Sequence, residues 1–349
     1  MYALIEAGAD VNAKNPDLSG HVLRAEIKNA GEREVRQMLG AIIGDIVGSI
    51  YEFHNIKTTE FKLFGDESKF TDDTVLTFAV AEALMQGGKA KHYVAAMKKY
   101  GRLYPNEKFF PCAGYGLNFL SWLQSNETKP YKSYGNGSAM RVSPVAWWFD
   151  NLEDVEKGAK VSAAVTHNHP EGIKGAQATA AAIFLARSGE PKDSIRDYIE
   201  GKYGYNLRRT LDEIRPIYEF DGSCQGTVPE ATIAFLESTG FEDAIRKAIS
   251  LGGDSDTLAA ITGGIAEAAY GVPEKIKKRA LSMLDETLLS LWNRWEKSVL
   301  TGISKPELER RMREVMEQCH ITESAIEETM AEGYTREDAT FLLLKGAGW

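Results

Sequence analysis

Cysteine is scarce in this chain, with three residues among 349, Cys112, Cys224 and Cys319. Their number and scatter exclude a disulfide framework, and they lack the paired spacing of a structural zinc site. Scattered cysteines of this kind are typical of reduced thiols. The sequence therefore predicts a cytoplasmic protein.

Long apolar runs are missing as well. No stretch has the length needed to cross a bilayer, and no basic segment followed by an apolar one opens the chain as a secretion signal would. We therefore expect a soluble protein that has no membrane partner.

Basic residues are also few relative to acidic ones. The 41 Lys and Arg residues stand against 50 Asp and Glu residues, which gives a net charge of -9. Proteins that bind nucleic acids cluster Lys and Arg against the phosphates, so no nucleic-acid-binding surface is evident. A small anionic substrate is still compatible with this charge, because bound metal ions would reverse the sign of the local field.

Two short acidic turns are the most informative stretches that are present. Residues 70–74 (FTDDT) and 252–257 (GGDSDT) lie far apart in the sequence, and each precedes an almost wholly apolar stretch, Val75–Met85 and Leu258–Ala269. These stretches have the pattern of buried helices. Each turn alone is explained by helix capping, because Thr or Asp at the N-cap and Asp in the first turn satisfy free amides.

The two turns together indicate more than capping. The starts of two buried helices would bring four aspartates and several hydroxyls to the floor of one cleft, where unpaired charge is costly. A cation resolves this conflict. Oxygen ligands without Cys or His suit Mg²⁺ or Mn²⁺ rather than zinc, and two groups of ligands suit a pair of ions.

Three further motifs extend the pattern. They are residues 44–52 (GDIVGSIYE), 134–141 (YGNGSAMR) and 166–170 (THNHP). With the two acidic turns, and in the same order, they resemble the motifs of the ADP-ribosylglycohydrolases, the family that includes dinitrogenase reductase-activating glycohydrolase. The resemblance spans roughly residues 40–271. It agrees with the recurring helical pattern and implies an all-α orthogonal helical bundle with the site at clustered helix starts.

The resemblance also implies the residues of the site. Two divalent cations, Mg²⁺ or Mn²⁺, would be bound by Thr71, Asp72, Asp73, Asp254, Asp256 and Thr257. Glu52 would orient the attacking water, and Asp72 or Asp73 would act as the base. The loop that cradles the distal ribose and the diphosphate would be Gly135, Asn136, Gly137, Ser138 and Met140, with His167 bonded to a ribose hydroxyl or the diphosphate.

The implied reaction is hydrolysis of the glycosidic bond between ADP-ribose and an acceptor. The acceptor would be a protein side chain such as arginine, or a small conjugate, and the bond would break through an oxocarbenium-like state. Two alternatives remain open. Pairs of metal ions on carboxylates also serve phosphoesterases and pyrophosphatases that act on nucleotides. The other alternative is a non-catalytic protein that only binds ADP-ribose.

The two ends of the chain differ from its middle. Residues 7–14 (AGADVNAK) resemble the turn that links ankyrin repeats, although a single repeat cannot bury its own apolar face. We expect three parts, namely a degenerate ankyrin-like segment at 1–38, a catalytic domain at 39–300 and a helical appendage at 301–349. The terminal segments are candidates for contact with a protein partner.

Local patterns predict three details near the first motif. Gly40, Gly44 and Gly48 recur at helical spacing and predict the close approach of a second helix. Asp45 and Glu52 are two helical turns apart, which predicts both carboxyls on one helical stripe. The polar loop that follows is expected to be able to cover the metal site.

Two other stretches carry expectations of their own. The stretch Lys275–Lys297 has a helical, amphipathic pattern. The segment 105–116 is rich in turn residues, and its aromatics Phe109, Phe110 and Tyr115 are predicted to be core side chains, with stacking on adenine as the alternative.

Overall fold

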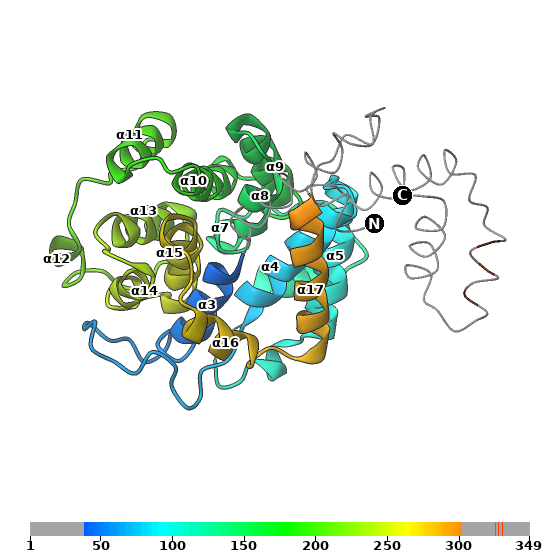
Figure 1. Ribbon diagram of the computed structural model, residues 1–349, viewed down its shortest axis with the longest axis horizontal. Coiled ribbons are helices and arrows are strands. Elements are labelled where there is room, and N and C mark those ends of the chain that lie inside the picture. The colour runs from blue at the N-terminus through cyan, green and yellow to red at the C-terminus, as the bar shows by residue number, and fades with distance from the viewer. Residues whose placement is uncertain (1–37, 113, 302–324, 326, 328–329, 331–349) are drawn as a thin grey trace, which may run out of the picture. The chain divides into compact units, whose positions relative to one another are not determined.

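The computed structural model describes residues 38–112 and 114–301, together with residues 325, 327 and 330 (Figure 1). Over these residues the protein is helical and has no strand, with one isolated antiparallel bridge between Gly135 and Ser223. The predicted all-α class is therefore confirmed for the part of the chain that is described. The ankyrin-like segment and the C-terminal appendage lie almost entirely outside it.

The chain divides into two compact units. One is Arg36–Trp295, and the other combines Met1–Val35 with Glu296–Trp349. The helices keep the labels of Figure 1. They are α3 (Leu39–Gly48), α4 (Asp72–Met85), α5 (Ala90–Leu103), α6 (Leu117–Gln124), α7 (Gly137–Met140), α8 (Ser143–Trp148), α9 (Leu152–Ala164), α10 (Pro170–Arg187), α11 (Lys192–Tyr203), α12 (Leu211–Ile214), α13 (Cys224–Leu236), α14 (Phe241–Ile249), α15 (Ser255–Tyr270), α16 (Glu274–Leu281) and α17 (Glu286–Thr301).

The central helix of the unit Arg36–Trp295 is α15. It is buried along almost its whole length and packs against α3, α4, α7, α10, α13 and α14. Figure 1 shows it beside α13 and α14. Small residues dominate its sequence, so neighbouring helices approach it closely from several sides. Because α15 begins with the second acidic turn, this packing places that turn in the interior.

Glycines bring α3 into backbone contact with α15. A Cβ atom at Gly44 would lie 2.0 Å from the carbonyl oxygen of Ala259, and one at Gly40 would lie 2.1 Å from that of Gly263. A Cβ at Gly48 would lie 2.5 Å from the Cα of Asp256. The spacing of these glycines thus has the packing role that the sequence predicts. The contact also fixes the end of α3 against the start of α15.

The N-terminus of α3 is capped from α15. Both carboxylate oxygens of Glu267 accept hydrogen bonds, one from the amide of Leu39 at 3.1 Å and one from the amide of Gly40 at 2.8 Å. Burial raises the pKa of Glu267 to about 8, against the opposing effect of these two bonds. The two helices are therefore joined at both ends of their interface.

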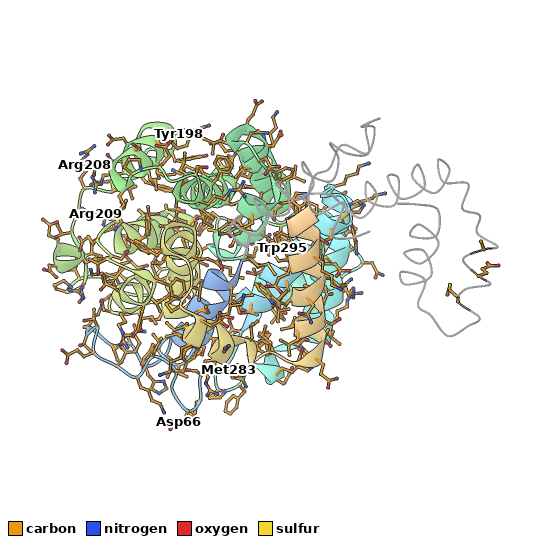
Figure 2. The ribbon with its side chains drawn as sticks, viewed as in Figure 1. Asp66, Tyr198, Arg208, Arg209, Met283 and Trp295 are labelled. Atoms are coloured by element: carbon orange, nitrogen blue, oxygen red, sulfur yellow. The ribbon has the colours of Figure 1, made fainter. Side chains whose placement is uncertain are left out.

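Outer helices are attached to this core by buried contacts. Glu156 of α9 accepts hydrogen bonds from the hydroxyls of Tyr198 (2.7 Å) and Tyr203 (2.6 Å) on α11. The ring of Trp295 on α17 packs on Trp148 of α8 with 5.6 Å between ring centroids. Figure 2 labels Tyr198, at the top of the helical unit in that view, and Trp295, near its middle beside α17.

The stretch Lys275–Lys297 is helical, as predicted, and forms two helices, α16 and α17, because Asp285 starts a new one by accepting a hydrogen bond from the amide of Leu288 at 3.0 Å. The expectation for Asp45 and Glu52 is wrong. Helix α3 ends at Gly48, so Asp45 and Glu52 do not share a helical stripe. Glu52 lies instead in the turn that follows α3.

Residues 54–69 form an irregular loop, as predicted. From the loop, the Nζ atom of Lys57 donates hydrogen bonds to the carbonyls of Tyr218 and Leu251. Toward the loop, Arg246 of α14 donates hydrogen bonds to two of its carbonyls. The loop is thereby attached to α14 and to the residues around the second acidic turn. Its role as a cover for the site stays a prediction. Of the helices in the described part of the chain, none combines the length and the apolar character that a bilayer crossing requires.

Candidate metal centre and active site

The first acidic turn is held in place by a buried carboxylate of α3. Thr71 is the N-cap of α4, and its hydroxyl accepts from the amide of Asp73 at 3.3 Å. The same hydroxyl donates to Asp45 at 2.6 Å, and Asp45 also accepts from the amides of Thr71 and Thr74 at 2.9 and 3.0 Å. Thr71 and Asp45 therefore cap α4 together, which leaves the carboxylates of Asp72 and Asp73 for other partners.

The second acidic turn depends on two glycines in the left-handed region. Gly252 and Gly253 have φ values of 72° and 69°, which residues with a Cβ rarely adopt. Asn55 brackets Gly253, because its side chain accepts from the Gly253 amide at 2.7 Å and donates to the Gly253 carbonyl at 3.0 Å. This turn delivers Asp254 to the N-cap of α15 and Asp256 to its first turn.

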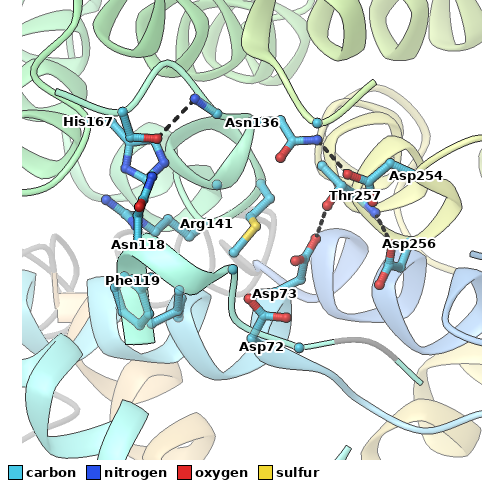
Figure 3. Close-up of a pocket in the computed structure, with 18 of the residues that line it drawn as sticks. Asp72, Asp73, Asn118, Phe119, Asn136, Arg141, His167, Asp254, Asp256 and Thr257 are labelled. Carbon is cyan, nitrogen blue, oxygen red and sulfur yellow. Dashed lines mark hydrogen bonds between the residues drawn. The ribbon is translucent and has the colours of Figure 1, made fainter. Parts of the chain in front are cut away.

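The two turns meet in space. The hydroxyl of Thr257 donates to Oδ2 of Asp73 at 3.0 Å, which links the first turns of α4 and α15 directly. Oxygens of Glu52, Asp254 and Asp256 all lie within 4.8 Å of one another. Figure 3 shows Asp72, Asp73, Asp254, Asp256 and Thr257 gathered at one end of a cavity. Three segments far apart in the sequence thus supply one acidic cluster.

The cluster is costly in the absence of a cation. Burial raises the pKa of Asp72 to about 8, and the charges of Asp45 and Asp254 act in the same direction. The pKa values of Asp73 and Asp256 are raised well above their usual range by burial and by the neighbouring carboxylates. These donors are all oxygens, which fits Mg²⁺ or Mn²⁺, and such an ion would relieve the repulsion among the carboxylates.

The loop before α7 and the start of α7 adjoin the acidic cluster, and the side chains of Asn136 and Ser138 are bonded within the protein. The side-chain amide of Asn136 donates to Asp254 at 2.7 Å and to Thr227 at 3.0 Å. The hydroxyl of Ser138 donates to the carbonyl of Gly172 at 2.7 Å and is fully buried. Asn136 therefore orients an acidic residue of the cluster, and the loop offers mainly its backbone to a ligand.

A buried relay lies behind His167. Arg141 donates to the hydroxyl of Thr166 at 2.7 Å, and that hydroxyl lies 2.8 Å from Nδ1 of His167. Burial lowers the pKa of His167 well below its usual value, and Arg141 adds to this effect, which favours the neutral imidazole. A Cβ at Gly137 would lie 3.2 Å from Nε2 of His167, so this nitrogen faces the loop before α7.

Most of these groups line one cavity of about 500 Å³. Its lining includes most of the residues that the sequence predicts, namely Glu52, Asp72, Asp73, Gly135, Asn136, Gly137, Met140, His167, Asp254, Asp256 and Thr257. Thr71 and Ser138 do not line it, because their hydroxyls are buried behind it in bonds to Asp45 and Gly172. Neither side chain is available to a ligand in the cavity without a rearrangement.

Four further residues of the site are given no role in it by sequence reasoning. Asp45 belongs to the first glycine-rich motif and carries the first acidic turn, and its signal is a carboxylate inside an otherwise apolar run. Arg141 is the last residue of its motif and lies fully buried in the cavity wall. Phe119 and Tyr131 are aromatics of the lining, but no local pattern distinguishes them from core residues.

The aromatics that the sequence offered as adenine platforms lie elsewhere. Phe109 and Tyr115 pack edge to face with 5.6 Å between ring centroids and are buried, as predicted for core side chains. Phe110 is 78% exposed, so the core prediction is wrong for this residue. None of the three is in the lining of the cavity within the described residues.

Comparisons with known proteins agree with the motifs. The sequence profile of the ADP-ribosylglycohydrolase family matches residues 28–331. The chain is 28% identical to the human ADP-ribosylhydrolase ARH3, with 68% of this chain and 85% of that protein covered. It is 27% identical to the ADP-ribosylarginine hydrolase Tri1 of Pseudomonas putida, with 79% and 82% covered.

A solved structure has a similar fold. An ADP-ribosylglycohydrolase-related protein complex matches with a TM-score of 0.57 at 23% identity, over 79% of this chain and 98% of that one. At this identity the likeness concerns the fold alone, and it agrees with the helical architecture described above.

Proposed function

Because the chain belongs to the ADP-ribosylglycohydrolase family, we propose that it is a metal-dependent hydrolase that cleaves the bond between ADP-ribose and an acceptor. One observation supports this most directly. Acidic residues of three segments, at Glu52, at Asp72 and Asp73, and at Asp254 and Asp256, gather at one end of a cavity whose other end holds a neutral histidine and a glycine-rich loop.

The acidic end is proposed to hold two divalent cations. The proposed ligands are Asp72, Asp73, Asp254, Asp256 and Thr257, and Glu52 is close enough to join them. Thr71, the sixth member of the predicted set, would join only if its hydroxyl left its hydrogen bond to Asp45. When bound, the cations would supply the positive charge that grips the ribose hydroxyls and offsets the charge of the aspartates. Asn136 keeps Asp254 oriented for this purpose through their 2.7 Å hydrogen bond.

The carboxylates also serve the chemistry itself. Cleavage at the anomeric carbon passes through an oxocarbenium-like state, which nearby negative charge stabilises. Glu52 lines the cavity from a turn rather than from a helix, so it is suited to orient the attacking water. Asp72 or Asp73 would then accept the proton of that water.

The other end of the cavity is proposed to bind the diphosphate half of the substrate. Gly135 and Gly137 have no side chain, so a ligand can approach their backbone closely. His167 would donate or accept a hydrogen bond through Nε2, and the buried charge of Arg141 behind it favours an anion at this end. Phe119 and Tyr131 offer aromatic surface to the base.

The acceptor is proposed to be a side chain of an ADP-ribosylated protein, such as arginine, or a related conjugate. Tri1, one of the relatives, is described as an ADP-ribosylarginine hydrolase, and ARH3 as an ADP-ribosylhydrolase. Both names concern the ADP-ribose half of the substrate, which the cavity would grip.

A release assay tests this proposal. Purified protein is incubated with arginine-linked, serine-linked and acetylated ADP-ribose, each with Mg²⁺, with Mn²⁺ and with excess EDTA. We expect free ADP-ribose from at least one substrate and at least about a 100-fold loss in EDTA, or about 3 kcal/mol in the barrier. Release of AMP or inorganic phosphate would instead identify a phosphoesterase or pyrophosphatase, and tight binding without turnover would identify a binding protein.

A further inference from the structure

A second groove of about 530 Å³ lies next to the cavity. It is formed by α12, by the segment between α12 and α13, and by α13 itself. Its lining is Arg209, Glu213, Ile214, Ile217, Tyr218, Glu219, Phe220, Asp221 and Glu230. Figure 2 labels Arg209, which lies by α12 at the edge of the molecule in that view. None of these residues belongs to the acidic cluster described above.

The groove carries an excess of negative charge. It contains four carboxylates and one guanidinium, and that guanidinium is already paired, because Arg209 binds Oε1 of Glu230 at 2.7 Å. Glu213 and Glu219 are exposed, and Glu213 also caps α12 through Thr210. Arg215 is paired with Asp212, and Lys57, which keeps its charge in its bond to the Tyr218 carbonyl, offsets one further carboxylate at Glu219. The free charge of the groove is therefore acidic.

A buried acceptor in the groove has no partner. Oε2 of Glu230 receives no hydrogen bond from any described residue, and the whole residue is 6% exposed. Leaving a carboxylate oxygen buried and unpaired is unfavourable, and burial raises the pKa of Glu230 accordingly. A positively charged side chain bound in the groove would offset the negative charge of this carboxylate.

Apolar side chains complete the groove. Ile217 is 80% exposed and Phe220 is 59% exposed, although both are large hydrophobic residues. A Lys or Arg side chain has an apolar stem and a cationic head. The stem matches Ile217 and Phe220, and the head matches Glu230 and its acidic neighbours.

The groove and the cavity share a wall. Phe220 lines both of them. The carbonyl of Gly222 accepts from the amide of Asn136 at 2.8 Å, and a Cβ at Gly253 would lie 2.7 Å from the ring of Tyr218. The segment 218–222 is thus fixed at both ends to the loops that carry the site, so a chain lying across it would reach the cavity.

We propose that this groove binds a basic side chain, Lys or Arg, that neighbours the modified residue in an ADP-ribosylated polypeptide. The inference rests on the proposed function and adds the class of acceptor, namely a polypeptide with basic residues near the modification. In this arrangement the basic neighbour of the modified residue lies against Phe220 and Glu230, away from the cations.

The test compares three substrates that carry the same linkage. They are an ADP-ribosylated peptide with basic neighbours, the same peptide with neutral neighbours, and an ADP-ribose conjugate without a peptide. The wild-type protein should have a KM for the basic peptide about tenfold below that for the neutral peptide, and the difference should shrink in high salt. Equal KM values for the two peptides would overturn the proposal.

Two variants locate the effect. Glu230→Gln keeps an acceptor for Arg209 but removes the charge and the unpaired oxygen, and Glu219→Gln removes an exposed charge of the same groove. Each should raise the KM for the basic peptide, by about tenfold for Glu230→Gln and about threefold for Glu219→Gln, with kcat and hydrolysis of the peptide-free conjugate unchanged.

A matched control removes charge elsewhere. Glu153→Gln and Glu190→Gln change exposed acids of the α9 and α10 region, outside the groove, and should leave all three KM values unchanged. An equal KM increase in this control would overturn the groove and assign the effect to net charge. Absence of release from every substrate, the peptide-free conjugate included, would refute the proposed function instead.

Discussion

The acidic cluster sets the balance between stability and activity at the scale of single residues. Asp256 lies among Glu52, Asp254 and Asp73, and its pKa is raised by burial and by these neighbours. Its carboxylate therefore costs stability until a cation is bound. The same side chain is held by the amide of Thr257 at 2.9 Å, so its position does not depend on the cation.

Asp256→Asn should separate these two effects. We expect at least about a 100-fold loss of ADP-ribose release, because one charge of the cation site is gone. We also expect a melting temperature in EDTA equal to or above that of the wild type, because the repulsion is smaller. Release assays and thermal unfolding with and without Mg²⁺ measure both.

The control for this variant is Asp66→Asn, which changes a fully exposed carboxylate paired with Lys62. It should retain activity and the stabilisation by Mg²⁺. An Asp256→Asn protein that still gains stability from Mg²⁺ as the wild type does would contradict the assignment of Asp256 as a ligand.

Element by element, the interface of α3 with α15 is the most constrained part of the fold. A Cβ at Gly44 would collide with the backbone of Ala259 at 2.0 Å, and backbone cannot move aside as a flexible side chain can. The close approach also determines where the turn after α3 places Glu52 relative to Asp254 and Asp256. Packing and site geometry therefore depend on the same glycines.

Gly44→Ala should destabilise the protein by about 2 to 4 kcal/mol, since overpacking at a backbone contact forces the helices apart. Chemical denaturation gives the free energy of unfolding. Gly201→Ala is the matched control, because this glycine lies within α11 and is exposed. No atom lies within 4 Å of the position that its Cβ would take.

Gly201→Ala should be neutral or stabilising by about 0.5 to 1 kcal/mol, because alanine is the better helix former and restricts the unfolded chain. Equal stability changes in the two variants would contradict the role of Gly44 as a contact between helices.

The sequence is informative about elements where a local pattern has one physical cause. The apolar stretches after residues 74 and 257 predict buried helices, and glycines at helical spacing predict a close helix contact, as found for Gly40 and Gly44. The break at Asp285 is different, because its signal is one capping residue inside a continuous amphipathic pattern.

Residues of the site were predictable to the extent that motifs carry them. The four aspartates and His167 line the cavity as expected from their motifs. Ser138 does not, because a sequence does not reveal which face of a short turn its hydroxyl takes. Arg141 acts on His167 through Thr166, and contacts of this kind exist only in three dimensions.

For the molecule as a whole, the buried carboxylate of Glu267 links global stability to pH. Its pKa in the folded protein is about 8, above the ordinary value of 4.5, so the folded state binds this proton more tightly than the unfolded state. Its contribution to stability is therefore complete below pH 4.5 and is lost as the pH rises toward about 8.

Glu267→Gln should remove this part of the pH dependence. Between about pH 5 and about pH 8 the melting temperature of the wild type should fall relative to that of the variant, because only the wild type has this proton to lose. Thermal unfolding over the pH series, with Mg²⁺ held constant, measures the difference. Parallel curves for the two proteins would contradict it, and Glu190→Gln should remain parallel to the wild type.

The contact between α3 and α15 also determines which part of the site can move. Two helices that touch through their backbones leave no room for a hinge, so the floor of the cavity is a rigid base. A molecule as long as a dinucleotide must then enter at the rim of the cavity that faces this base. Leu117 and Phe220 line the cavity there and are 85% and 59% exposed. We therefore expect motion of the site to be confined to that rim, with the spacing of Asp254 and Asp256 unchanged.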